Sequence, residues 1–286
     1  MDIIRTKKEM HAQMKAARAQ GKSIALVPTM GALHEGHLTL VRQAVASCDV
    51  TVVSLFVNPR QFNNPDDLKS YPRKPEEDAK LLEREGVNYL YMPIVEDIYD
   101  DTEGERKFDF GMLDKVMEGT HRPGHFEGVA QVVSRLFDIA IPHKAFFGEK
   151  DFQQLAIIKK MVKDYSFPLE IVPVPIVRAE SGLALSSRNQ LLSAEELRIA
   201  PYIHATLIES DKLRQEKKLK TPSEVVNFVV NKLNAQPPLR VEYFEIVDSA
   251  TLKQIDNWEE SQYPIGCIAC YCGEVRLIDN HKYYQE

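Results

Sequence analysis

The feature that most constrains the fold is an alternation of short apolar runs and helix-like segments over roughly the first 180 residues. Residues 24–28 and 50–57 are almost wholly apolar, as expected for strands that are covered on both faces. Between them, residues 37–47 place apolar side chains near one helical face. Helices are then predicted over 75–85, 127–141 and 152–164, and strands over 87–93, 144–147 and 171–178. This order predicts an α/β fold with a doubly wound parallel sheet.

The pattern changes after the predicted strand 171–178, whose two prolines favour a sheet edge or a strand end. Helix-like residues 193–215 follow, and a second helix starts near Thr221 after a lysine-rich linker. Strand-like residues 241–248 and 265–272 come next, with a short apolar RLI near the end of the chain. Helices followed by strands predict a smaller C-terminal α+β domain.

Length and charge narrow the class of protein. The 286 residues suit one large domain or two ordinary ones, and the change of pattern predicts domains at 1–178 and 179–286. Lysine and arginine total 36 against 42 acidic residues, which gives a net charge of −6. That balance argues against nucleic acid or a membrane surface as a general partner, because such proteins usually carry a basic excess. A local basic pocket for one phosphorylated ligand is compatible with it.

The N-terminal residues 1–22 have helical spacing and lack the apolar core of a signal peptide. No stretch approaches the ~20 apolar residues needed to cross a bilayer. We therefore expect a cytoplasmic protein with no membrane partner.

Cys267, Cys270 and Cys272, three of the four cysteines, cluster in IGCIACYCG. A zinc site usually pairs such a cluster with a second Cys or His pair at a set spacing, and none follows. The run also has the pattern of a strand, which would place Cys270 and Cys272 on one face and Cys267 on the other. Buried strand cysteines are the favoured interpretation, and metal binding is the alternative.

Residues 28–37, PTMGALHEGH, join the first predicted strand to its helix. Ligands of open α/β sheets bind at the carboxyl ends of strands, where this loop is expected. Gly31 and Gly36 allow close approach of the backbone, and a helix that begins near His37 directs free N–H groups toward a phosphate. His34 and His37 could then donate to nucleotide phosphates, although a tight turn with two surface histidines would give the same pattern.

Two further segments carry groups suited to phosphate. Residues 148–151 (GEKD) stand at another strand-to-helix junction, where Lys150 could counter phosphate charge and Asp151 could cap the helix or bind a ribose hydroxyl. Residues 185–189 (LSSRN) offer two hydroxyls and an arginine, which can bind phosphate through two parallel bonds. Taken singly, helix capping and a polar interdomain loop explain these segments as well.

Together these motifs resemble the pantothenate synthetase family. PTMGALHEGH is similar to the signature of that family and contains the HxGH element of the wider nucleotidylyltransferase-like ATP-binding superfamily, and LSSRN resembles the second phosphate loop of that superfamily. The resemblance spans nearly the whole chain, through FVNPRQF (56–62), YPR (71–73), RPGHFEGV (122–129), GEKDFQQL (148–155) and RLID (276–279).

The resemblance implies a Rossmann-like domain with a smaller C-terminal domain that covers the active site, usually in a homodimer. It implies ATP-dependent condensation of pantoate with β-alanine to pantothenate, AMP and pyrophosphate, through a pantoyl-adenylate intermediate. ATP would be bound together with Mg²⁺. The partners implied are therefore small molecules: pantoate, β-alanine and ATP.

The same resemblance implies roles for particular residues. Gln61 and Gln154 would hold the hydroxyls and carboxylate of pantoate, with Asn58 close by. The groups implied in adenylation are His37, His34, Lys150, Ser186, Ser187 and Arg188. The ATP site would be lined by Met30, Gly31, His34, Gly36, His37, Gly148, Lys150, Asp151, Val177, Leu185, Ser186, Ser187 and Arg188.

Four positions leave questions open. Many relatives read DGLAMSSRN where this chain has Ser181 and Leu185, and the loss of one charge at Ser181 leaves its role unassigned. Glu77 and Asp78 lie where some relatives have metal-associated acids, but a solvated helix start explains them as well. Protein ligands for a metal are therefore not assigned from the sequence.

The implied reaction agrees with the chemistry of the residues. A carboxylate is a poor electrophile, so amide formation requires a mixed anhydride, and preorganised donors stabilise the charge that develops on the phosphates. A competing hypothesis is a nucleotidylyltransferase, which keeps the nucleotide in its product, and a third is a nucleotide sensor without catalysis. The Gln61/Gln154 pair and GTHRPGHF (119–126) match the ligases.

Overall fold

The computed structural model describes residues 1–100 and 104–284 and divides into two compact units. The first unit comprises Met1–Phe110, Arg122–Glu149 and Gln154–Pro175. The second comprises Gly111–His121, Lys150–Gln153 and Ile176–Glu286. None of the helices in the described ranges has both the length and the apolar character of a membrane span.

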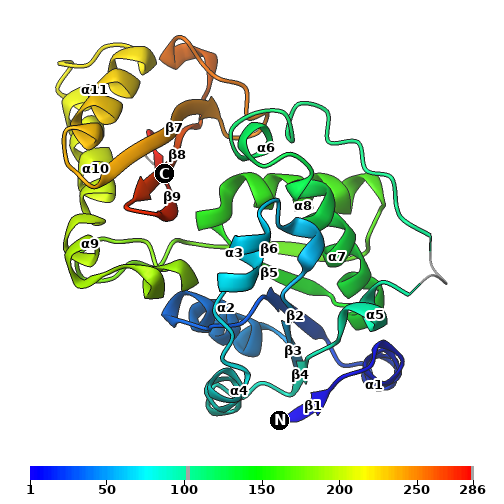
Figure 1. Ribbon diagram of the computed structural model, residues 1–286. Coiled ribbons are helices and arrows are strands. Elements are labelled where there is room, and N and C mark those ends of the chain that lie inside the picture. The colour runs from blue at the N-terminus through cyan, green and yellow to red at the C-terminus, as the bar shows by residue number, and fades with distance from the viewer. Residues whose placement is uncertain (101–103, 285–286) are drawn as a thin grey trace. The chain divides into compact units, whose positions relative to one another are not determined.

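A six-stranded sheet forms the centre of the first unit, in the order β1-β4-β3-β2-β5-β6 (Figure 1). All of its pairings are parallel. The direction of winding reverses between β2 and β5, because β3 and β4 lie on one side of β2 and β5 and β6 on the other. This topology confirms the predicted doubly wound sheet. Its strands are β1 (Asp2–Ile4), β2 (Ile24–Thr29), β3 (Val50–Leu55), β4 (Tyr89–Tyr91), β5 (Lys144–Gly148) and β6 (Glu170–Val174).

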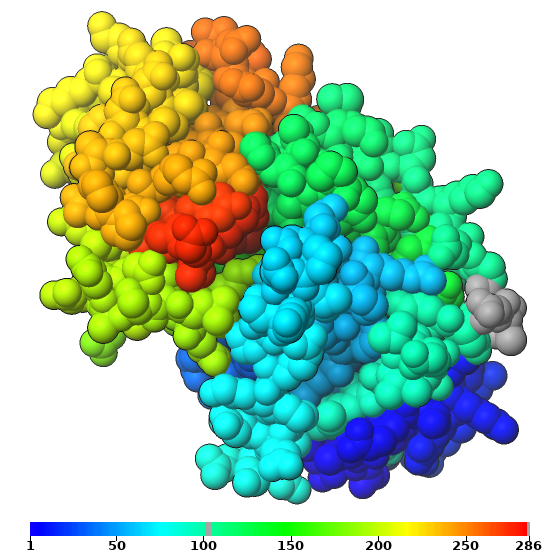
Figure 2. All heavy atoms as spheres, in the orientation of Figure 1, coloured from blue at the N-terminus to red at the C-terminus, as the bar shows by residue number. Residues whose placement is uncertain are grey.

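Helices cover both faces of the central strands of this sheet. Ala25 and Val27 of β2 pack with Val41 of α2, and the alternate positions Ile24 and Leu26 are fully buried as well. The helix α3 buries none of its residues, and its atoms lie at the surface in Figure 2. The helices are α1 (Lys7–Ala19), α2 (Glu35–Ser47), α3 (Pro65–Ser70), α4 (Pro75–Arg84), α5 (Val95–Ile98), α7 (His125–Ala140) and α8 (Phe152–Asp164), whose first two residues belong to the second unit.

The second unit is built on an antiparallel sheet of three strands in the order β7-β8-β9. One face of it packs against two helices, with Leu207 and Val229 buried against Phe244 and Ile268. This arrangement confirms the predicted α+β character. The elements are α6 (Glu118–His121), α9 (Ala194–Ile199), α10 (Tyr202–Gln215), α11 (Pro222–Asn234), β7 (Leu239–Asp248), β8 (Pro264–Cys272) and β9 (Val275–Lys282).

Prolines account for two differences from the predicted elements. The helix expected over 193–215 is divided, because α9 ends at Ile199 and α10 begins at Tyr202, directly after Pro201. Proline has no N–H to continue the hydrogen bonds of a helix. The strand expected over 171–178 ends at Val174, before Pro175, and lies at the sheet edge as its prolines predicted.

The clustered cysteines lie in β8, as predicted, and all three are buried. Cys270 and Cys272 belong to the apolar cluster between this sheet and its helices, and Cys267 lies outside that cluster. Burial raises the pKa of the Cys270 thiol to about 12 and that of Cys272 to about 11. Within residues 1–100 and 104–284, no group of three or more His, Cys, Asp or Glu side chains is arranged to hold a metal ion.

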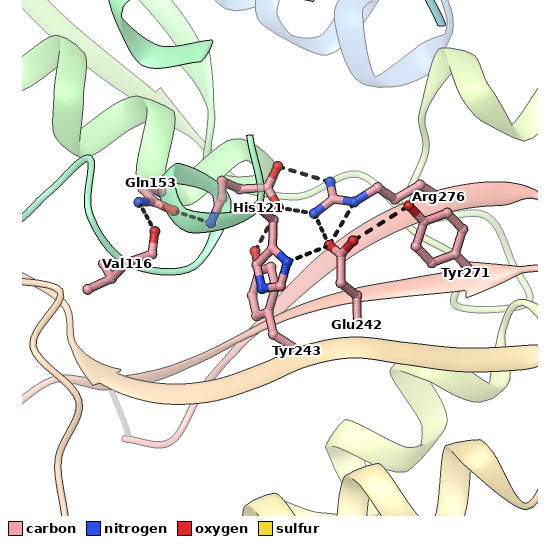
Figure 3. Close-up of polar contacts among 8 residues, drawn as sticks. Val116, His121, Gln153, Glu242, Tyr243, Tyr271 and Arg276 are labelled. Carbon is pink, nitrogen blue, oxygen red and sulfur yellow. Dashed lines mark hydrogen bonds and ion pairs between the residues drawn. The ribbon is translucent and has the colours of Figure 1, made fainter. Parts of the chain in front are cut away.

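A polar network explains why residues 111–121 belong to the second unit although the chain on either side belongs to the first (Figure 3). Glu118 of α6 accepts bonds from Arg276 of β9, at 2.6 and 3.0 Å, and from the hydroxyl of Tyr243 at 2.9 Å. Arg276 also donates to Glu242, at 2.5 and 3.0 Å. His121 stacks on Tyr243 and lies 3.8 Å from Glu242. Most of these groups are partly or fully buried, so the paired charges fix α6 on the sheet.

Candidate active site

The signature loop, residues 30–37, follows β2 at the switch point of the six-stranded sheet. Open α/β sheets bind ligands at the carboxyl ends of the strands that flank such a point. Gly31 has φ +85°, a left-handed conformation that favours glycine, and a Cβ there would lie 3.1 Å from Oδ2 of Asp78. Gly148 ends β5, the strand next to β2, so both strands at the switch point lead into predicted site segments.

The helix α2 begins at Glu35, two residues before the predicted start near His37, because His34 provides its N-cap. Nδ1 of His34 accepts from the N–H of Gly36 at 3.1 Å. Nδ1 of His37 accepts from the N–H of His34 at 3.4 Å. These bonds satisfy backbone donors at the start of the helix, which otherwise have no partner within it.

The histidine pair, His34 and His37, lies side by side with ring centroids 4.0 Å apart, as their spacing predicted. Because each Nδ1 accepts a hydrogen bond, the neutral form of each ring carries its proton on Nε2. Two Nε2–H donors thus stand at the positive end of α2. Donors and helix end together suit an anionic ligand such as phosphate.

Two explanations were open for Asp78, a metal-associated acid or a solvated helix start, and the structure excludes the solvated one. Its side chain in α4 is buried, and its two oxygens accept bonds from the N–H groups of Ala32 and Leu33, each at 2.8 Å. Burial raises the pKa of the Asp78 carboxyl above its ordinary value, and the two backbone bonds oppose that shift. Asp78 therefore fixes the signature loop. Glu77 is exposed and pairs with Lys74 at 3.4 Å.

Asn58 and Gln61, predicted to lie at a pantoate site, are buried next to each other and to Met30 of the signature loop. Asn58 donates to Oε1 of Gln61 at 3.1 Å and to the carbonyl of Gly128 at 3.0 Å. Nε2 of Gln61 lies 3.1 Å from Sδ of Met30. The Tyr99 hydroxyl, which the sequence did not single out, donates to Oδ1 of Asn58 at 2.8 Å and holds its amide. The structure thus places the side-chain amides of Asn58 and Gln61 next to the signature loop.

Two adjacent glutamines at the start of α8 differ in what they contact. Gln153 is buried and fully engaged, since it bonds the carbonyls of Leu113 and Val116 and the N–H of Glu118. The side-chain amide of Gln154 is only partly buried and has no hydrogen-bond partner among the described residues. Of the two, Gln154 has the side-chain amide that a ligand could bind, and its contact with pantoate stays a prediction.

The remaining predicted groups belong to the second unit. The Lys150 amine lies 3.2 Å from the Asp151 carboxylate, and both residues are in a short 3₁₀ turn before α8. The serine loop, residues 185–189, forms a turn in which the Ser186 hydroxyl accepts from the N–H of Arg188 at 3.3 Å. The N–H of Leu185 bonds the carbonyl of Val177 at 3.0 Å, so two predicted ATP contacts are brought together.

Known proteins match this chain along its whole length. The family model described as pantoate–β-alanine ligase matches residues 2–282. A pantothenate synthetase from Bacteroides fragilis (strain YCH46) is 54% identical over 283 residues, which cover 99% of each chain. The pantothenate synthetase of Porphyromonas gingivalis (strain ATCC BAA-308 / W83) is 53% identical with the same coverage.

Solved structures agree with these matches. A pantothenate synthetase from Thermus thermophilus has a TM-score of 0.92 and 40% sequence identity, covering 100% of both chains. A pantoate–β-alanine ligase from Francisella tularensis, complexed with beta-gamma ATP and β-alanine, has a TM-score of 0.83 and 35% identity, covering 100% of this chain and 99% of its own. From the family model and from relatives more than half identical to it, the chain belongs to the pantoate–β-alanine ligase family.

Proposed function

We propose that this chain joins pantoate to β-alanine, the reaction of its family, in two steps: ATP first activates pantoate as an adenylate, and β-alanine then displaces AMP. The observation that carries the proposal is the histidine pair at the start of α2, next to the buried Asn58 and Gln61 at the same loop. These neighbouring positions support a phosphate site beside an amide-lined site for a hydroxy-acid.

In the first step a carboxylate oxygen of pantoate attacks the α-phosphorus of ATP. The bond from that phosphorus to the bridging oxygen breaks, and pyrophosphate leaves with the electron pair. Negative charge grows on the phosphoryl oxygens and on the leaving group, and donors fixed in advance stabilise it. We assign this role to the Nε2–H groups of His34 and His37, and to Lys150, Ser186, Ser187 and Arg188.

ATP would be bound together with Mg²⁺, which would neutralise part of the phosphate charge. We assign the contacts to the nucleotide to Met30, Gly31, Gly36, Gly148, Asp151, Val177 and Leu185. Glycines suit such contacts because no side chain keeps a ligand away from the backbone.

Pantoate is held by neutral amides. A glutamine can donate through its NH₂ group and accept through its oxygen, so Gln61 and Gln154 can pair with both hydroxyl and carboxylate groups. Asn58, whose amide oxygen accepts from Tyr99, donates to Oε1 of Gln61 and so orients its side chain.

In the second step the amine of β-alanine attacks the carbonyl carbon of pantoyl-adenylate, and AMP leaves. This step needs the two reactants held close together and water kept out, so a nucleophilic serine or cysteine is not required. The three clustered cysteines are suited to packing instead, since burial keeps their thiols protonated.

The competing nucleotidylyltransferase would retain AMP in its product, whereas the family matched over residues 2–282 is one of ligases. A homodimer and a cytoplasmic location are further proposals that rest on the resemblance to the family. So is the division in which residues 1–178 form the ATP- and pantoate-binding domain and residues 179–286 the smaller domain that covers the active site. Exchange of pyrophosphate into ATP tests the proposed order of steps.

Replacing Gln61 with alanine is expected to raise the KM for pantoate by roughly 5- to 150-fold and to change the KM for ATP little. The reason is that a hydroxyl or carboxylate left unpaired in a dry pocket typically costs ~1–3 kcal/mol. Steady-state kinetics with each substrate varied in turn measure the two constants. Gln131→Ala is the matched control, because Gln131 is a buried glutamine of the same unit that bonds Arg106 and Glu127. A selective rise in the KM for ATP would assign Gln61 to the other substrate.

A further inference from the structure

The C-terminal strand β9 carries two buried polar residues that the reaction steps above do not use. Asp279 and Asn280 are each 5% exposed, and Asp279 ends the RLID motif. Burying a carboxylate is costly unless it is paired and hydrogen-bonded. Both side chains contact segments of the second unit that carry proposed phosphate donors.

Asp279 binds a hairpin, residues 178–184, that leads into the serine loop. Its two oxygens accept from the two terminal nitrogens of Arg178, at 2.6 and 2.8 Å, the bidentate geometry of a strong ion pair. Arg178 also donates to the carbonyl of Gly182 at 3.2 Å, so it crosses the hairpin and holds its turn. The side chain of Arg178 is 19% exposed, so water screens this pair only in part.

The hairpin itself is short. Arg178 and Ala184 form an isolated antiparallel bridge, and the N–H of Ala179 bonds the carbonyl of Leu183 at 2.9 Å. A small cavity lies against it, lined by Leu183, Ala184, Ser186, His204 and Asp279 among others. Asp279 lines this cavity and, through Arg178, holds the hairpin beside it. Ser186 follows this hairpin directly, after Leu185.

Asn280 binds the short turn before α8 that carries Lys150. Its Nδ2 donates to the backbone carbonyl of Lys150 at 3.2 Å. Side chains of successive strand residues point to opposite faces, so Asp279 and Asn280 can reach two different segments from one strand. The N–H of Asn280 also bonds Oδ1 of Asp279 at 2.8 Å, which couples the two anchors.

We propose that Asp279 and Asn280 are positioning residues for adenylation, which set the spacing between the Lys150 amine and the donors of the serine loop. This inference rests on the proposed function of Lys150, Ser186, Ser187 and Arg188 as phosphate contacts. β9 pairs with β8 from Ile265↔Lys282 to Cys272↔Val275, so its anchors are held by a continuous ladder. A displacement of either segment by about 1 Å is enough to lower a reaction rate by up to ~100-fold.

The test compares the full-length variants Asp279→Asn and Asn280→Ala in pyrophosphate exchange. Asp279→Asn is expected to lower kcat/KM for ATP by on the order of 10- to 100-fold, with the KM for pantoate within about twofold of the wild-type value. Asn280→Ala is expected to act in the same direction with a smaller effect, since it removes one neutral bond. Asp211→Asn is the matched control, because Asp211 also pairs with an arginine of the same unit, Arg214, at 2.8 Å, and its contact with His281 of β9, at 3.6 Å, reports any general disturbance of that strand.

Arg188→Ala and Lys150→Ala, measured in parallel, separate this inference from the proposed function. If both use ATP normally, the assignment of the phosphate donors fails. If they are impaired while Asp279→Asn and Asn280→Ala behave as wild type, the positioning role alone fails. An equal loss for ATP and pantoate, or the same loss in Asp211→Asn, would indicate general loss of structure and would also overturn it. Should Asp279→Asn not fold, Asn280→Ala decides by the same criteria.

Discussion

His37→Ala is expected to lower the rate of adenylation by about 100-fold or more, the usual effect of losing one donor to a developing negative charge. The Nδ1 atom of His37 accepts a backbone bond, so the neutral ring carries its proton on Nε2, the nitrogen to which we assign the phosphate contact. The variant also loses that capping bond, which typically costs about 1 kcal/mol of stability. Rapid-quench measurement of pyrophosphate release in a single turnover reports the rate, and circular dichroism reports the fold.

His11→Ala is the matched control for this variant. His11 is also partly buried in the first unit, but its Nδ1 lies 3.2 Å from the carbonyl of Ile139, within the packing of α1 against α7. This control is expected to keep the wild-type adenylation rate. A folded His37→Ala enzyme with normal single-turnover kinetics would remove His37 from the mechanism.

Asp78→Ala is expected to reduce both stability and adenylation. It takes away the acceptor of two buried backbone N–H groups, on Ala32 and Leu33, and a buried group without a partner costs about 1–3 kcal/mol. We therefore expect a loss of about 2 kcal/mol or more in the free energy of unfolding, measured by urea denaturation. The signature loop would also lose its fixed conformation, so pyrophosphate exchange should fall on the order of 100-fold.

The neighbouring variant Glu77→Ala provides the control, because Glu77 is exposed and such surface substitutions change stability by only about 0.5 kcal/mol. A role of Asp78 in binding magnesium would give a different result. In that case stability would be unchanged, and excess Mg²⁺ would restore the rate of Asp78→Ala. The anchoring role predicts a loss that Mg²⁺ does not restore.

The sequence predicts the architecture well wherever local pattern determines it. The apolar run at 24–28 and the helical face after it correspond to β2 and α2, within a residue or two. The strand order β1-β4-β3-β2-β5-β6 could not be obtained in this way, because β1 pairs with β4, a segment far along the chain. Such pairing depends on long-range contacts that no local window contains.

The same contrast between local pattern and long-range contacts applies to the candidate site. The motifs identified the candidate residues that contact ligand, such as His34 and His37, because a short loop between a strand and a helix has a recognisable composition. The residues that hold those loops were not identified in that role. Asp78 binds a loop 45 and 46 residues away, and Asp279 and Asn280 bind partners 101 and 130 residues away. The RLID motif was the one signal that pointed to Asp279, and it did not indicate a partner.

The most direct test of the account is pyrophosphate exchange with pantoate and no β-alanine. If the acid is charged first, radiolabelled pyrophosphate should enter ATP when enzyme, Mg²⁺, ATP and pantoate are present. Omitting pantoate should abolish the exchange, and adding β-alanine should release AMP and form the amide. Exchange that strictly required β-alanine would contradict a pantoyl-adenylate formed before the amine reacts, even in an enzyme that makes pantothenate.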